Sequence, residues 1–183
     1  MLQVITGGSG SGKSSFAENQ VMGSELEKRI YIATMIPYGE EGARRVERHR
    51  KMRAQKNFQT LECYLDLEKL KLEGECAVLL ECMSNLTANE FFREDGPVFE
   101  SADEKISFVA DKIEQGIHSL KDQAKELYIV TNEVFSDGIQ YDPETENYIK
   151  CLAGVNKRLA RMADSLTEVV FGIPISIKEP ERK

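Results

Sequence analysis

Two short stretches of this chain carry residue types that can do chemistry. The first, TGGSGSGKSS at residues 6–15, places the glycines, lysine and serine of the pattern GxxxxGK[ST] at their required spacing. The second, ARRVERHRKMR at residues 43–53, surrounds His49 with cations in a chain whose formal net charge is −7. The first stretch indicates phosphate binding, and the second offers positive charge around an imidazole.

The glycine-rich stretch predicts a loop that cradles a nucleoside triphosphate. It follows a strand-like apolar run at 2–5 and precedes a plausible first helix at 16–21, a context that a flexible Gly/Ser turn does not explain. Glycines let successive N–H groups turn toward a phosphate, and the following helix presents its positive end. Lys13 is expected to reach the β and γ phosphates, and Ser14 to ligate Mg²⁺. The predicted nucleotide-binding residues of this loop are Gly7, Gly8, Ser9, Gly10, Ser11, Gly12, Lys13 and Ser14.

A second magnesium ligand should be an acid at the end of a buried strand close to the loop. Glu81 ends the apolar run at 77–80 and is the preferred candidate. Glu133, which follows the run at 127–130, is the rival, although it can equally be read as a loop or helix-start acid. We therefore predict Ser14 and Glu81 as the metal residues and keep Glu133 as the alternative.

The basic stretch allows two interpretations. Clustered Arg and Lys can neutralise a triphosphate and stabilise a pyrophosphate leaving group while an imidazole attacks the α-phosphorus. On a helix, Arg45 and Arg53 would share the face of His49, and nearby cations would disfavour protonation of its ring. The other interpretation is a solvated helical face that happens to contain a histidine. The pattern alone leaves both open.

The chain of 183 residues fits one domain, which we place at 1–178, with a C-terminal tail at 179–183. Stretches with helical spacing, the clearest of which begin at Ser101 and at Pro143, separate short apolar runs typical of strands. This alternation favours an α/β fold with a mostly parallel central sheet flanked by helices. The GxxxxGK[ST] pattern makes that fold P-loop NTPase-like. The predicted strands are 2–5, 30–33, 77–80, 127–130 and 168–173.

Composition excludes several classes of protein. The acidic balance argues against broad nucleic-acid binding, and no apolar run approaches the roughly 20 residues that span a bilayer. The N-terminus lacks the features of a signal peptide, so a cytoplasmic location is expected, with the four cysteines reduced.

A regulatory GTPase would read guanine with NKxD, whereas Asn156-Lys157 is followed by Arg158 and lacks the aspartate. A small-molecule kinase or transferase remains.

Further pieces extend along the chain in a characteristic order. They are TGGSGSGKS at 6–14, YIAT at 31–34, RVERHR at 45–50, TLEC at 60–63, VLLEC at 78–82, VTNEV at 130–134, and VNKRLARMAD at 155–164 followed by FGIPISIK. In these pieces the chain resembles the bifunctional adenosylcobinamide kinase and adenosylcobinamide-phosphate guanylyltransferase family of cobalamin biosynthesis. The order and spacing are more specific than a P-loop alone.

The resemblance implies two reactions and a set of residues for them. Adenosylcobinamide is phosphorylated on its aminopropanol hydroxyl, and GMP is then transferred from GTP to the phosphate, giving adenosyl-GDP-cobinamide. His49 would be the catalytic residue and become covalently guanylylated.

The resemblance also implies ligands and an assembly. The expected cofactor is Mg²⁺, with ATP and GTP as substrates, a corrinoid as small-molecule partner, and a homotrimer as assembly. The nucleotide-binding residues that the resemblance adds are Ile32, Ala33, Thr34, Arg50, Lys51, Met52, Arg53, Glu62 and Glu81. The alternative function is a P-loop kinase of another small molecule, without guanylyl transfer.

Overall fold

A seven-stranded sheet forms the centre of the protein in a computed structural model that describes residues 1–37, 39, 44, 47, 56–135 and 138–180. The strand order is β3-β2-β4-β5-β1-β6-β7, and neighbouring strands are parallel except for the antiparallel pair of β6 and β7. The strands are β1 Leu2–Thr6, β2 Arg29–Ala33, β3 Phe58–Glu62, β4 Ala77–Glu81, β5 Glu126–Val130, β6 Ser165–Val170 and β7 Ile173–Lys178.

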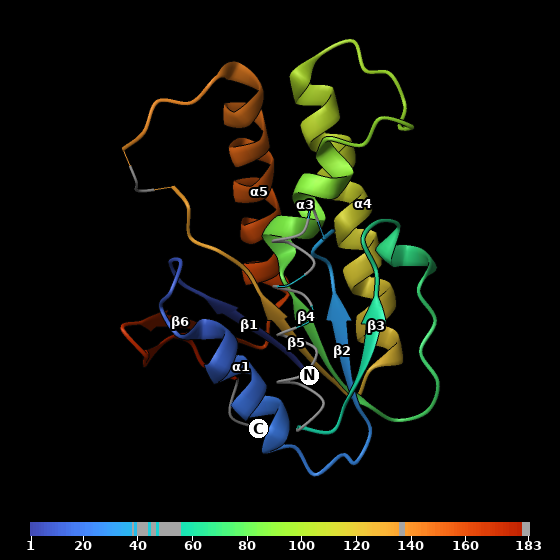
Figure 1. The fold of residues 1–183 in the computed structure, drawn as a ribbon, viewed down its shortest axis with the longest axis vertical. Coiled ribbons are helices and arrows are strands. Elements are labelled where there is room, and N and C mark those ends of the chain that lie inside the picture. The colour runs from blue at the N-terminus through green and yellow to red at the C-terminus, as the bar shows by residue number, and fades with distance from the viewer. Residues whose placement is uncertain (38, 40–43, 45–46, 48–55, 136–137, 181–183) are drawn as a thin grey trace.

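Helices cover both faces of this sheet (Figure 1). Helix α1 packs on one face, while α3, α4, α5 and the short η1 pack together on the other. Their bounds are α1 Lys13–Met22, η1 Leu67–Lys69, α3 Met83–Phe91, α4 Ala102–Gln123 and α5 Pro143–Met162. None of these described helices is long and apolar enough to cross a membrane. The predicted fold class, a mostly parallel α/β sheet flanked by helices, is confirmed.

The two long helices begin where their sequence signals predict. Ser101 caps α4, because its hydroxyl accepts a hydrogen bond from the N–H of Glu104 at 3.2 Å. Asp142 caps α5 by accepting from the N–H groups of Glu144 and Thr145, each at 3.0 Å, and Pro143 occupies the first turn. Each cap satisfies N–H groups that have no partner within the helix.

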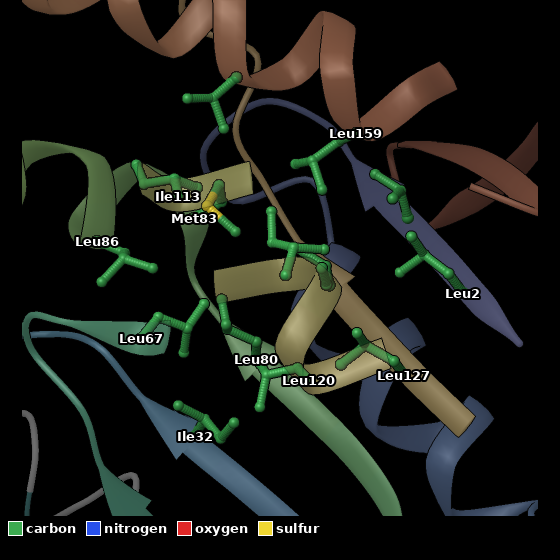
Figure 2. Packing of buried hydrophobic residues seen from close by; sticks show 14 of the residues in the cluster. Leu2, Ile32, Leu67, Leu80, Met83, Leu86, Ile113, Leu120, Leu127 and Leu159 are labelled. Atoms are coloured by element: carbon green, nitrogen blue, oxygen red, sulfur yellow. The ribbon is translucent and has the colours of Figure 1, made fainter. Parts of the chain in front are cut away.

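The larger core lies between the sheet and the α3, α4 and α5 layer (Figure 2). Leu80 of β4, Met83 of α3 and Leu120 of α4 are fully buried there, and Ile113 is 2% exposed. Burial of each such side chain stabilises the fold by about 1.5–3 kcal/mol relative to exposure. This layer holds β4 in place and therefore fixes where its carboxyl end lies.

A charged cluster fastens η1, α3 and α4 to one another. The Asp66 carboxylate accepts hydrogen bonds from Lys112 and from Arg93, the latter at 2.7 Å. Glu90 accepts from Lys112 at 2.8 Å and from the N–H of Asp66 at 2.6 Å. The hydrogen bonds from Lys112, Lys69 and Arg93 hold the pKa of Asp66 well below its ordinary value. The carboxylates of Asp66 and Glu90 thus join the three elements.

The strand predicted at 168–173 is wrong in one respect, because the chain reverses direction within it. Strand β6 ends at Val170, Phe171 and Gly172 form the turn, and β7 returns antiparallel with Ile173 opposite Val170. Phenylalanine is not a typical turn residue, so residues 168–173 have the sequence pattern of one continuous apolar strand. Strand β3, at 58–62, was not among the predicted strands.

Candidate nucleotide-binding site

The carboxyl ends of the parallel strands place several predicted residues in one row. The register pairs Ala33 with both Glu62 and Glu81, and pairs Glu81 with Val130. Residues paired across neighbouring strands point to the same face of a sheet. Val130 packs in the cluster beneath α1, with Ala33 packed against it, so Glu62, Ala33 and Glu81 line the α1 face at this edge.

The glycine-rich loop connects β1 to α1 at the same edge. Gly10 and Gly12 have φ angles of 73° and 91°, in the left-handed region that L side chains rarely adopt. A Cβ atom on Gly7 would lie 2.5 Å from the carbonyl oxygen of Val169 and 2.7 Å from the hydroxyl of Ser11. The loop can therefore follow this path only with glycine at these positions.

Lys13 is held inside the loop. Its side chain is 9% exposed, and its ammonium donates a hydrogen bond to the carbonyl oxygen of Gly8 at 3.0 Å. Burial lowers the pKa of Lys13, while the negative charge of Glu81 acts in the opposite direction. A buried cation at the start of α1 is well placed to attract the oxygens of a phosphate.

Ser14 and Glu81 come together from sequence positions far apart. The Ser14 hydroxyl donates a hydrogen bond to Oε1 of Glu81, and the Tyr31 hydroxyl donates to Oε2 at 2.8 Å. Sequence reasoning missed Tyr31. The signal was present, because Tyr31 lies two residues before Ala33 in β2 and so shares its face of the sheet.

A hydroxyl and a carboxylate are oxygen ligands of the kind that Mg²⁺ prefers. Ser14 and Glu81 place such oxygens within hydrogen-bond contact of each other, beside a loop whose glycines leave room for a ligand. The hydroxyl oxygen of Ser11 in the loop is buried without a hydrogen-bond partner among the described residues. These features fit a triphosphate with its magnesium ion.

The carboxylate of the rival acid, Glu133, accepts a hydrogen bond within its own turn. The backbone N–H of Glu133 donates to the carbonyl of Gly7 at 3.2 Å, so this residue does lie beside the loop. Its carboxylate, however, accepts a hydrogen bond from the N–H of Phe135 at 2.8 Å and so closes its own turn. Glu81, and not Glu133, contacts Ser14.

The end of β2 is tied to the segment that follows β4. The Thr34 hydroxyl accepts from the N–H of Cys82 and donates to its carbonyl, each at 2.8 Å. Asn89 of α3 donates to the Thr34 carbonyl, also at 2.8 Å. The side chain of Ile32 is fully buried in the core on the α3 face, so it lies away from the α1 face where Glu81 and Ser14 meet.

Other predicted residues lie farther along the edge or outside the described part of the chain. Glu62 is exposed at the end of β3 and accepts a hydrogen bond from the Tyr64 hydroxyl at 2.8 Å. His118 is exposed on α4. The residues that lie outside the described ranges are His49, Arg50, Lys51, Met52 and Arg53, and their roles stay predictions.

Comparison with known sequences points to one family. The sequence model of that family, described as cobinamide kinase / cobinamide phosphate guanyltransferase, matches residues 3–177. A relative from Salmonella typhimurium, the bifunctional adenosylcobalamin biosynthesis protein CobU, is 32% identical over 188 residues, covering 97% of this chain and 100% of the relative. A relative of the same description from Escherichia coli is 30% identical with the same coverage.

Solved structures of low sequence identity share the fold. One solved ATPase domain superimposes with a TM-score of 0.52 at 12% identity, covering 100% of this chain and 78% of that chain. A prototypical ATPase from the type III secretion system of pathogenic bacteria gives a TM-score of 0.55 at 9% identity, covering 96% of this chain and 56% of that chain. These similarities concern the fold alone.

Proposed function

The chain belongs to the cobinamide kinase / cobinamide phosphate guanyltransferase family, and from that premise we propose that it performs both reactions at the P-loop edge of its sheet. It phosphorylates adenosylcobinamide and then transfers GMP from GTP to the product, giving adenosyl-GDP-cobinamide. The observation that carries the proposal is the contact of Ser14 with Glu81 beside the buried Lys13, in a chain that matches this family over nearly its whole length.

In the kinase step the protein supplies positioning and charge. The loop N–H groups and Lys13 hold the phosphates of the nucleotide, while the substrate hydroxyl oxygen forms a bond to the γ-phosphorus. The bond from that phosphorus to the nucleoside diphosphate breaks, and the hydroxyl proton is lost to solvent. Mg²⁺, when held by Ser14 and Glu81, supplies neutralisation of charge on the phosphate oxygens. Ala33 and Glu62 line the same edge, Thr34 directly follows β2, and all three are proposed to complete the nucleotide site.

The guanylyl step is proposed to proceed through His49. An imidazole nitrogen forms a P–N bond to the α-phosphorus of GTP, and pyrophosphate leaves. A phosphate oxygen of adenosylcobinamide phosphate then attacks the same phosphorus, the P–N bond breaks, and the imidazole is free again. Arg50, Lys51 and Arg53 are proposed to offset the negative charge of the triphosphate and of the leaving pyrophosphate.

The proposed setting of these reactions is the cytoplasm, with the chain assembled as a homotrimer and residues 1–178 acting as one functional unit. All four cysteines are free thiols, and three of them are buried, which suits a reducing compartment. The homotrimer rests on the family resemblance alone. Sedimentation of the purified protein would measure it directly.

Transfer of label from GTP tests the proposed function. We expect GTP labelled in the α-phosphate to leave covalent label on the protein in the absence of corrinoid. Adenosylcobinamide phosphate should then remove that label and appear as labelled adenosyl-GDP-cobinamide. A kinase of another small molecule would phosphorylate its substrate but take up no label from GTP, which would contradict the guanylyl step.

The contact between Ser14 and Glu81 leads to a prediction about magnesium. Glu81→Gln removes the negative charge while keeping the shape of the side chain, so the magnesium concentration that gives half-maximal kinase rate should rise. The rise should be at least about tenfold, since loss of a residue that only hydrogen-bonds to a metal ligand already lowers metal affinity by about that factor. The measurement is a magnesium titration of both activities, with Glu133→Gln as the matched control. A shift in Glu133→Gln alone would assign the metal to the rival acid.

A further inference from the structure

The turn between β6 and β7 carries a residue that neither local conformation nor packing explains. Because Val170 pairs with Ile173, the turn consists of Phe171 and Gly172, with φ angles of 50° and 80°. Two-residue turns with positive φ at both positions favour Asn, Asp or Gly at the first, whereas a bulky side chain there is strained. Phe171 is nevertheless 94% exposed, so no apolar burial compensates the strain.

This turn is fastened to the phosphate loop. The N–H of Gly172 donates a hydrogen bond to the carbonyl oxygen of Ser11 at 2.8 Å. A Cβ atom on Gly12 would lie 3.3 Å from the Cα atom of Gly172, so the two backbones are in close contact. Figure 1 shows the red hairpin of β6 and β7 beside the blue loop that precedes α1. Phe171 is thus an exposed aromatic ring next to the proposed triphosphate site.

The strand order places the turn on the side of the loop opposite to the proposed metal site. Strand β1 leads into the loop, β6 is its neighbour on one side, and β4 lies on the other side beyond β5. Glu81 ends β4 and contacts Ser14, so the proposed magnesium end of the nucleotide lies toward β4. The phosphates and the base occupy opposite ends of a nucleotide. A nucleotide bound with its magnesium end toward β4 would extend its base toward β6, where the turn lies.

We propose that Phe171 is the stacking surface for the purine base of the bound nucleoside triphosphate. This inference rests on the proposed function, in so far as the loop takes a nucleoside triphosphate. Base stacking on an aromatic ring is tolerant of base identity, because every base has a π face. Stacking on Phe171 gives ATP and GTP a common base site, in a chain that lacks the guanine-reading NKxD pattern.

The first test compares ligands with and without a base. Phe171→Asn places a residue in the turn that adopts positive φ readily, so the variant should fold at least as stably as the parent protein. Its dissociation constants for ATP and GTP should rise by about 5- to 100-fold, whereas the constant for inorganic triphosphate should stay within about twofold. Val98→Asn, which changes a side chain that is 98% exposed in the loop between α3 and α4, is the matched control and should bind all three ligands normally.

A second variant reports on the contact directly. The chain has no tryptophan, so Phe171→Trp introduces a single indole whose fluorescence belongs to this turn. ATP and GTP should quench that fluorescence, and inorganic triphosphate should not. Sedimentation of both variants tests whether Phe171 instead packs against a second copy of the chain.

These measurements distinguish failure of the stacking inference from failure of the proposed function. Unchanged nucleotide affinity in Phe171→Asn, equal weakening of triphosphate, or altered self-association with normal nucleotide binding would each overturn the stacking inference. Failure of the parent protein to bind either nucleotide would instead overturn the proposed function. The two failures are distinguishable because the parent protein is measured in the same titrations.

Discussion

Replacing Lys13 with alanine is expected to abolish both phosphorylation of adenosylcobinamide and transfer of GMP. Lys13 lies buried in the phosphate loop, with its ammonium 3.0 Å from the Gly8 carbonyl oxygen. In the proposed complex this cation would turn to the phosphate oxygens, and its loss would leave their charge uncompensated. Removal of a single preorganised donor to developing charge typically lowers the rate by about 10²–10³.

The measurement is the rate of each reaction on the same preparation. Lys125→Ala is a matched control, because Lys125 precedes β5 at the opposite edge of the sheet and its side chain is 64% exposed. It should leave both rates near those of the parent protein. A normal rate of either reaction in Lys13→Ala would mean that the chain holds a second triphosphate site.

His49→Asn is expected to separate the two reactions. The proposed nucleophile disappears, whereas the loop that positions the γ-phosphate is unchanged, so GMP transfer and covalent labelling should vanish. Phosphorylation of adenosylcobinamide should persist within about tenfold, a loss of at most about 1.4 kcal/mol in transition-state stabilisation. His118→Asn, at an exposed position of α4, is the matched control and should retain both activities.

The chemistry of the label adds an independent criterion. A P–N bond to an imidazole should survive alkali and be lost in mild acid, unlike a phosphate ester on serine or threonine. Mapping the labelled residue in the parent protein should identify His49. An acid-stable label, a label on another residue, or undiminished GMP transfer by His49→Asn would contradict the proposed nucleophile.

The sequence alone was enough to predict the loop and its surroundings, because the determinants are local. Glycines at fixed spacing between an apolar run and a helix permit few conformations, and the structure has β1, the loop and α1 in that order. Local sequence could not decide between Glu81 and Glu133 as the magnesium ligand. It depended on which carboxylate faces Ser14, and that follows from strand order and register, which a single sequence does not specify.

Other features could not be predicted because their signals are ambiguous. The run that contains Phe171 has no residue typical of a turn before its glycine, so its reversal of direction was hidden. Tyr31 reads as an ordinary buried aromatic residue until β2 is placed beside β4, when its hydroxyl reaches Glu81. The role of His49 rests on family resemblance, since a basic helical stretch can also be a solvated surface.

The cluster around Asp66 determines how this part of the protein responds to acid. Hydrogen bonds, first from Lys112 and then from Lys69 and Arg93, hold the folded-state pKa of this carboxyl below the value of about 3.9 that it has in an unfolded chain. The contribution of the cluster to stability is therefore complete above about pH 5. Below about pH 4 the Asp66 carboxyl takes up a proton more readily in the unfolded chain than in the folded protein. The stabilisation is therefore lost as the pH falls from about 4 through the depressed folded-state pKa. The contacts between η1, α3 and α4 thus withstand mild acidification.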